Sequence, residues 1–259
     1  MEVVLIIVGV AVLILSLFFI IFIDAKLIFW YLFKKKTFKR RMIRQYKKSN
    51  ITLTYLGTLH HMHYTFKEYN FLHIKAILEN MKPDLLLIES RQEEINKGNL
   101  ADGPIEMVYT HLRAKQLGIP VKGIDYFNET TGKPGSTNKP RDLMMFNKLT
   151  SELDGYHNVL VIVGATHMLM HKRMLKNHGF KRYKLSKSLM DDYFTYPQDE
   201  VFAFPKALPE LIQTRIKHEQ AYLKTYKTEP WQKAGKRIIT NLEQLLDKID
   251  KEEILIKDE

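Results

Sequence analysis

The chain of 259 residues contains no cysteine. Structural disulfides, thiolate metal sites and a cysteine nucleophile are therefore excluded. The sequence also contains no G-x-G-x-x-G, no Walker A motif and no G-x-S-x-G, the usual signatures of dinucleotide-binding, P-loop and serine-hydrolase proteins. Internal repeats and low-complexity tracts are missing too. Apolar residues make up 45% of the chain, which is enough for a folded core.

Charged side chains are missing from the first segment, Val3 to Ile23, which is 21 residues long. A helix of this length, at about 1.5 Å per residue, reaches about 30 Å, the thickness of a bilayer core. Only Met1 and Glu2 precede the run, whereas a cleaved signal peptide begins with a positive region. We therefore expect residues 1–33 to form a transmembrane anchor followed by an interfacial segment.

Acidic residues are missing from the next segment, Lys34 to Lys48, which holds nine lysines and arginines. Such a cluster next to a membrane helix is typical of the cytoplasmic side. We expect residues 34–50 to be a basic juxtamembrane segment that attracts anionic lipid headgroups at residues 34–48, and we expect no nucleic-acid partner. The chain would then be a single-pass protein of the cell membrane with a cytoplasmic domain.

The rest of the chain predicts an α/β domain over residues 51–204 and a helical pair over residues 205–259. Strands alternate with helices in the domain, and this order predicts a mainly parallel sheet flanked by helices. The pair breaks at Glu229–Pro230 and either caps the sheet or offers a surface to a protein partner. The strands are expected at 51–59, 84–90, 120–127, 158–165 and 181–186, and the helices at 66–81, 104–118, 141–153 and 167–179.

Titratable side chains follow each of the first four predicted strands. In an open parallel sheet, ligands bind beyond the carboxyl ends of the strands, so these side chains predict a functional site there. Two imidazoles and a carboxylate from separate strand ends can hold a divalent metal and leave positions open for water or substrate. The same groups without a metal can act as general acid and base. In chain order these residues are His60, His61, His63, Glu89, Arg91, Asp125 and His167.

Three short motifs in this region resemble those of the TraB/PrgY/Tiki superfamily, which includes GumN-like proteins and is related to the erythromycin esterases. The family hallmark is two G-x-x-H motifs with a glutamate between them. Here they read GTLH at 57–60, IESR at 88–91 and GATH at 164–167. The stretch PRDLMM resembles a further family element, with Pro140 in place of the usual acid, and GIPVKGID resembles the segment that carries the family's aspartate. The resemblance covers about residues 52–185.

The resemblance implies a metal-dependent hydrolase that acts on a peptide or ester bond. Its metal ligands would be His60, Glu89 and His167, and the metal would be Mn, Zn, Co or Fe. Arg91 would orient Glu89 or stabilise an oxyanion. Asp125 or His63 would assist proton transfer. The histidine pair His167 and His171 has zincin spacing but lacks the zincin glutamate, so that interpretation is rejected.

Two alternatives stay open at this point. Some members of the superfamily are regulators of peptide pheromones without an established reaction, so the chain could be a non-catalytic, membrane-bound regulator or ligand-binding protein. It would then use the same pocket for a peptide or small molecule and its C-terminal helices for a partner. The histidine cluster also allows a haem or iron carrier.

Overall fold

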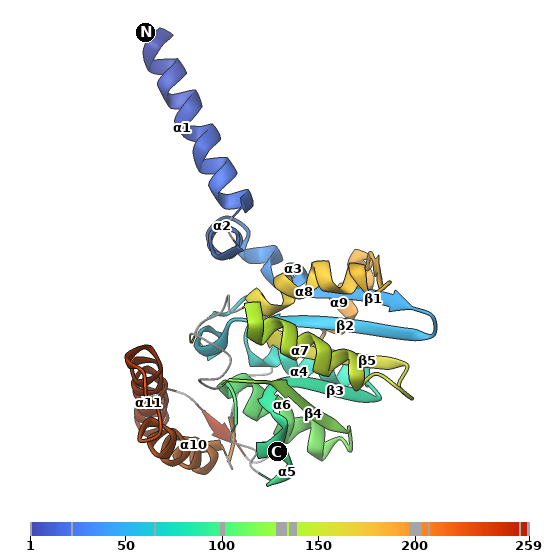
Figure 1. The fold of residues 1–259 in the computed structure, drawn as a ribbon, viewed down its shortest axis with the longest axis vertical. Coiled ribbons are helices and arrows are strands. Elements are labelled where there is room, and N and C mark those ends of the chain that lie inside the picture. Colours follow the sequence, from blue (N-terminus) through green and yellow to red (C-terminus); the bar gives the residue numbers. More distant parts are fainter. Residues whose placement is uncertain are drawn as a thin grey trace.

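The structure is a computed structural model that describes residues 2–21, 23–64, 66–98, 102–127, 134, 139–196, 204–206, 208–253 and 255–257. At its centre is a six-stranded sheet in the order β4-β3-β5-β2-β1-β6 (Figure 1). Two strands of two residues each, β7 and β8, pair with each other apart from it. The bounds are β1 Ile43–Lys48, β2 Ile51–Thr58, β3 Leu85–Arg91, β4 Val121–Asp125, β5 Asn158–Gly164, β6 Lys181–Tyr183, β7 Phe204–Pro205 and β8 Ile256–Lys257.

The direction of the strands makes this a mixed sheet. Strands β4, β3, β5 and β2 run parallel to one another. Strand β1 is antiparallel both to β2 and to β6, so it is the reversed strand among the six. The predicted α/β class is confirmed, and the four predicted strands that carry the candidate site residues form the parallel part of the sheet.

Strand β1 lies inside residues 34–50, which the sequence predicts to be a juxtamembrane segment. It follows the short helix α3 (Phe38–Met42) and forms a hairpin with β2. The side chains of Phe38, Ile43 and Tyr46 are buried in the core. Apolar residues spaced among the lysines and arginines therefore bring this segment into the domain, whose core includes residues that precede residue 51.

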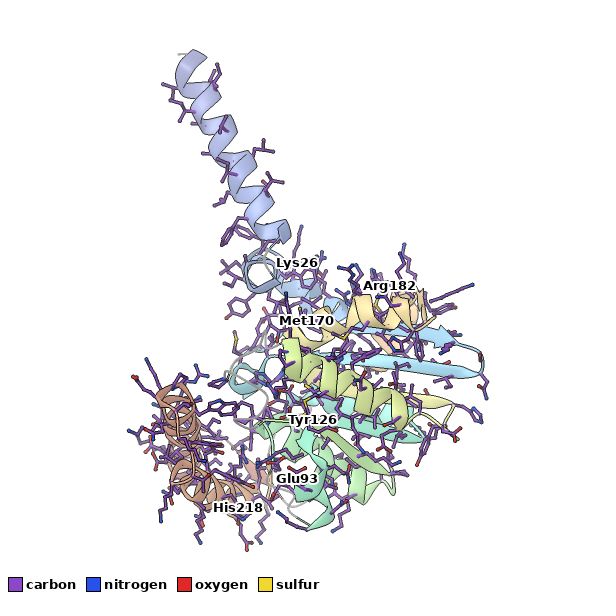
Figure 2. All side chains as sticks on the ribbon, in the orientation of Figure 1. Lys26, Glu93, Tyr126, Met170, Arg182 and His218 are labelled. Carbon is purple, nitrogen blue, oxygen red and sulfur yellow. The ribbon has the colours of Figure 1, made fainter. Side chains whose placement is uncertain are left out.

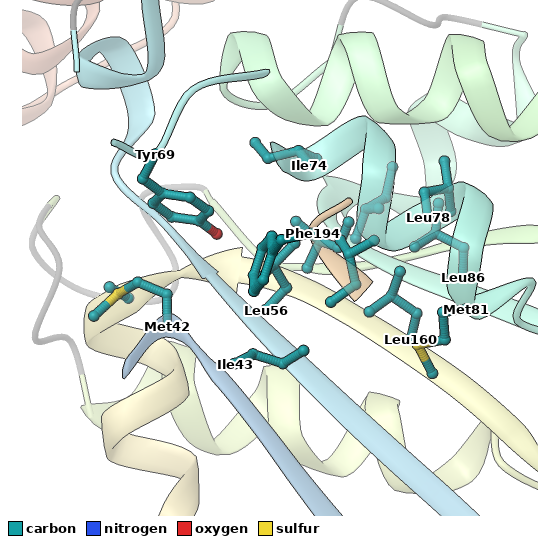
Figure 3. Packing of buried hydrophobic residues seen from close by; sticks show 14 of the residues in the cluster. Met42, Ile43, Leu56, Tyr69, Ile74, Leu78, Met81, Leu86, Leu160 and Phe194 are labelled. Atoms are coloured by element: carbon teal, nitrogen blue, oxygen red, sulfur yellow. The ribbon is translucent and has the colours of Figure 1, made fainter. Parts of the chain in front are cut away.

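Helices cover both faces of the sheet, which gives three layers. The parallel strands are apolar on both faces, as expected for strands buried on both sides. Leu56, Leu86 and Leu160 point to one face (Figure 3), and Leu87 and Val161 point to the other. The first face is covered by α4 (Phe71–Met81), α6 (Ile105–Gln116) and α9 (Lys187–Tyr193), and the second by α7 (Lys139–Ser151) and α8 (Ala165–Asn177).

The predicted C-terminal helical pair corresponds to α10 (Leu208–Leu223) and α11 (Glu229–Asp250), which lie together in Figure 1. Helix α11 begins at the predicted break, with proline in its first turn, where a missing N–H is tolerated. The pair packs on α4 and α6 through an apolar cluster that includes Phe71 and Tyr109. The short helix α5 (Gln92–Asn96) follows β3.

Two helices precede the domain. Helix α1 (Glu2–Ile21) extends away from the domain in Figure 1, and its large apolar side chains between Val4 and Phe18 are 46–65% exposed. Among the residues that the structure describes, no helix is both long enough and apolar enough to cross a membrane. Helix α2 (Ile23–Phe33) instead rests on the domain, because Trp30 is buried against it.

Candidate functional site

The carboxyl ends of the four parallel strands meet at one edge of the sheet, where the connecting helices α6, α7 and α8 begin. The centre of this edge lies between β3 and β5, which are neighbours in the sheet. The connections through α4 and α6 cover one face there, and the connection through α7 covers the other, so this is a topological switch point. Glu89 of β3 connects the ends of these two strands, since its Oε2 accepts a hydrogen bond from the N–H of Gly164 in β5 at 2.6 Å.

Glu89 is buried and makes two further contacts through its other oxygen. Oε1 accepts a hydrogen bond from Nη2 of Arg141 at 2.9 Å and lies 3.3 Å from Nε2 of His167. Burial alone would raise the pKa of Glu89, but the imidazole of His167 and the guanidinium of Arg141 hold it well below its usual range. Glu89 is therefore a carboxylate at neutral pH, in contact with the second G-x-x-H motif.

His167, in the first turn of α8, is held between two carboxylates. Its Nδ1 lies 2.6 Å from Oδ1 of Asp142, which comes from α7, and its Nε2 faces Glu89. Burial works against the charged imidazole, but Glu89 and Asp142 outweigh it and raise the pKa of His167 to about 9. The carboxylate of Asp142 thus fixes which way the ring points.

His60 repeats this arrangement on the other G-x-x-H motif. It follows β2 with a φ of +53°, a left-handed conformation that non-glycine residues adopt rarely. Its Nδ1 lies 2.8 Å from Oε1 of Glu106 in α6, and the hydroxyl of Thr58 donates to the same oxygen at 2.7 Å. Burial lowers the pKa of His60, but Glu106 and then Glu89 outweigh it, so the pKa is raised. The His60 side chain is 40% exposed, which makes it the solvent-facing part of the site.

The glycine of each motif makes room for the other motif. A Cβ on Gly164 would lie 2.9 Å from Nε2 of His60 and 3.3 Å from Oε2 of Glu89. A Cβ on Gly57 would lie 3.1 Å from the Cα of Ala165. His60 Nε2 and Glu89 therefore both lie against the backbone of the second motif, and His167 contacts the other oxygen of Glu89.

Arg91, the predicted partner of Glu89, lies elsewhere. Its guanidinium donates to Oδ1 of Asp102 from Nη2 at 2.7 Å and from Nε at 3.1 Å, and it stacks on the ring of Tyr222. The register of β3 against β4 shifts between Ile88 and Arg91, so residues two apart no longer share a side. The guanidinium that binds Glu89 belongs to Arg141, which lies in the PRDLMM stretch and had no predicted role.

The two residues predicted to assist proton transfer have other partners. Asp125 accepts a hydrogen bond from Nε of Arg141 at 2.7 Å, so it positions the guanidinium. His63 is fully buried, with Nε2 accepting the N–H of Leu59 and Nδ1 donating to the carbonyl of Tyr69. Burial lowers the pKa of His63 to about 4. Because both ring nitrogens are engaged inside the protein, His63 stabilises the turn after β2 and does not reach a substrate. The side chain of His61 lies outside the described residues.

Sequence reasoning missed Glu106 and gave Asp142 no role. Both stand near the start of helices that begin at the same edge of the sheet as the strand ends. Glu106 is a fully buried acid among apolar neighbours in α6, and Asp142 is a fully buried acid in α7. One sequence signal could have identified both residues. Each is an acidic residue in the first turn of a helix that begins at the carboxyl ends of the strands.

The site holds the kinds of donor atom that bind divalent metals, but a guanidinium lies among them. Each imidazole has its Nδ1 held by a buried carboxylate, which is the arrangement that metal-bound histidines usually show. Nη1 of Arg141 lies 3.3 Å from Nε2 of His167, while its Nη2 binds Glu89. As the side chains stand, no group of three His, Asp or Glu residues among those described is arranged to hold a metal.

Comparisons with known proteins add no family to this geometry. The chain matched no protein-family model, no curated protein and no solved structure. The TraB/PrgY/Tiki resemblance therefore rests on the motifs alone, and the functional argument rests on the contacts described above.

Proposed function

We propose that this chain is a hydrolase of the TraB/PrgY/Tiki type that acts on a peptide or ester bond. It would hold a divalent transition metal, Mn, Zn, Co or Fe, through His60, Glu89 and His167. One observation carries the proposal. Each G-x-x-H histidine has its Nδ1 bound to a buried carboxylate, which leaves Nε2 on the side of Glu89.

The charges around the site support a cation there. Four carboxylates are gathered around one guanidinium and two imidazoles whose pKa values are raised. A divalent ion that displaces imidazole protons would still balance the charge of these carboxylates. These groups are Glu89, Glu106, Asp125 and Asp142 around Arg141, His60 and His167.

In the proposed reaction the side chains around the site would have separate roles. A metal ion at the site would lower the pKa of a bound water and polarise a carbonyl. Glu106 and Asp142 keep the two imidazoles oriented. Arg141, fixed by Asp125 and stacked on Phe127, supplies a guanidinium for the negative charge that develops on the substrate oxygen. In the overall reaction, water adds its hydroxyl to the acyl carbon and its proton to the leaving group.

A second candidate is a non-catalytic ligand-binding protein of the same fold. The contacts of Arg141 with both Glu89 and His167 favour it, because they take up donor atoms that a metal would need. In that case the guanidinium and the half-exposed imidazole of His60 would bind an acidic or peptide ligand directly.

Metal analysis of the full chain, purified in detergent, separates the two candidates. The hydrolase proposal expects stoichiometric transition metal that is lost in His60→Ala, His167→Ala and Glu89→Gln. The matched control is His157→Ala, since His157 is exposed and its side chain contacts Asn50 rather than a residue of the site. A folded chain that takes up no metal, or variants that retain it as the control does, would overturn the hydrolase proposal and favour the second candidate.

We also propose that α1 anchors the protein in the cell membrane with the domain in the cytoplasm. The uncharged run of 21 residues and the exposed apolar side chains of α1 support the anchor, and the basic segment supports the orientation. Extraction of membranes at alkaline pH should leave the chain in the pellet, and a C-terminal reporter should be active only in the cytoplasm. Release into the supernatant would contradict the anchor, and a periplasmic or extracellular reporter would contradict the orientation.

A further inference from the structure

A cavity of about 520 Å³ lies at the junction between helix α2 and the domain. Its walls come from α2, α3, β1, β6 and α8, so it exists only when the chain is folded. In Figure 2, Lys26 and Arg182 lie on the side of the domain from which α2 and α1 extend. The cavity is separate from the strand-end site. Six cationic side chains line it: Lys26, Arg40, Arg41, Arg44, Lys172 and Arg182.

The positive charge of this cavity is largely uncompensated. Arg40 pairs with Asp191, with 2.9 Å between Nε and Oδ1. Within the described part of the chain, no carboxylate forms an ion pair with any of the other five cations. The pKa of Lys26 is lowered by its burial and by the charges of Arg44, Lys172 and Arg41. Like charges gathered in one cavity repel each other, and a bound anion would relieve that repulsion.

Arg44 is the strongest single indication of a ligand. It lies on β1, it is only 8% exposed, and its Nε is buried without a hydrogen-bond partner in the described structure. The Nε of Arg41 is in the same condition. A buried guanidinium N–H without an acceptor is unfavourable, and each of these groups lines the cavity. An anion with several oxygens would satisfy them.

Trp30 gives the cavity one flat wall. The guanidinium of Arg41 lies 5.4 Å from the centre of its ring, and Nζ of Lys26 lies 5.3 Å from it. Stacking on an aromatic ring restricts a guanidinium and leaves its edge free to bind oxygens in pairs. The cavity therefore combines guanidinium and ammonium groups, a combination that suits phosphate oxygens.

We infer that this cavity binds a phosphate-bearing anion. The chemistry is shared by two sources, the headgroup of an anionic phospholipid and a soluble phosphate compound. Phosphate fits better than a single carboxylate because five uncompensated cations surround the space. The inference is independent of the proposed hydrolase, because none of the lining residues binds Glu89, His60 or His167.

The test uses the full chain in a maltoside detergent, which carries no phosphate. Trp30 lines the cavity and is one of two tryptophans, so its fluorescence reports binding. Pyrophosphate and short-chain phosphatidylglycerol are titrated separately. Binding of pyrophosphate assigns a soluble source, and binding of phosphatidylglycerol alone assigns a lipid headgroup. If neither probe binds, the inference is overturned.

Variants then place the binding in the cavity. Lys172→Gln, at an exposed position on α8, and Arg44→Gln should each raise Kd about tenfold, the loss of roughly one charged hydrogen bond. If Arg44→Gln does not fold, Lys172→Gln decides alone. The matched control is the double variant Lys34→Gln, Lys36→Gln, which removes exposed charge from the same basic segment outside the cavity. If the control weakens binding as much as Lys172→Gln does, the binding is general charge attraction and the inference fails.

Discussion

The Oδ1 atom of Asp142 lies 2.6 Å from Nδ1 of His167, inside the protein and away from solvent. Glu106 stands in the same relation to His60. Each carboxylate comes from a helix that begins at the sheet edge, so the two halves of the site are built alike. The pairing implies that the imidazoles act through Nε2 and that their orientation is set by the acids.

Replacement of the first acid tests that role. In Asp142→Asn the amide oxygen can still accept a hydrogen bond from Nδ1–H but carries no charge, so His167 becomes a poorer ligand. We expect the affinity of the full chain for Mn²⁺ or Zn²⁺, measured by calorimetry, to fall about 10- to 100-fold. Asp154→Asn, at an exposed position, is the control. Equal affinity in the two variants would remove Asp142 from the site.

Gly164 tests whether the two motifs meet. In Gly164→Ala the new methyl group would lie 2.9 Å from Nε2 of His60, and the half-exposed ring can move away into solvent. We therefore expect metal binding to be lost while the thermal midpoint changes little. Gly9→Ala is the control, because a Cβ there meets nothing within 4 Å. Retained metal in Gly164→Ala would show that His60 is not a ligand.

Much of the fold could be predicted because apolar runs mark buried strands directly. The segment that contains Leu86 and the one that contains Val161 are apolar on both faces, and both form parallel strands as expected. Strand β1 was missed because its arginine and lysines resemble a membrane-proximal cluster. Its burial depends on Tyr46 and Ile43, two residues too few to give a pattern among so many charges.

The site was predictable only in part for a different reason. Glu89 and His167 stand at the ends of β3 and β5, which are neighbours in the sheet, so their contact follows from the strand order. The partner of Glu89 depends on a register shift that the spacing of residues 89 and 91 does not reveal. Arg141 and Glu106 reach the site from helices, and pairings between helices and strands depend on packing distances that one sequence does not contain.

Arg91 provides a contrast with Arg141. Its guanidinium pairs with buried Asp102. We therefore expect Arg91→Gln to lower the free energy of unfolding by about 3 kcal/mol. This value is at the low end for a broken buried ion pair, because Arg215 still contacts Asp102. Metal content should be unchanged. Chemical denaturation and metal analysis of the same sample check both points. A metal-free but fully stable Arg91→Gln protein would restore the sequence-based role for Arg91.

Metal binding should depend on pH through His167. Its pKa of about 9 means that both ring nitrogens carry a proton at neutral pH. The proton must leave before Nε2 can bind a metal, so affinity should fall about tenfold per pH unit below pH 9 for each proton displaced. Calorimetry in buffers of different ionisation enthalpy measures the protons released. Binding without proton release would show that His167 is not a ligand.

Acid stability depends on a separate set of histidines. Burial lowers the pKa of His63 and of His171 from 6.5 to about 4, and both side chains are fully buried. In the unfolded chain these imidazoles take up protons near pH 6.5, whereas in the folded chain they stay neutral until about pH 4. The unfolded state therefore binds more protons in this window, and stability falls as the pH decreases through it. Above pH 6.5 both histidines are neutral in the folded and the unfolded chain, so the stability that they contribute as buried neutral groups is fully present.

Each of these histidines should account for a loss of up to about 3 kcal/mol between the two ends of the window. In His171→Gln we expect a lower thermal midpoint at neutral pH, because the contact with Tyr55 is altered, but a shallower decrease towards pH 4. The exposed His178 gives the control variant His178→Gln, which should keep the slope of the unmodified chain. If His171→Gln and His178→Gln lose stability with acid at the same rate, His171 is not the buried neutral group that the fold requires.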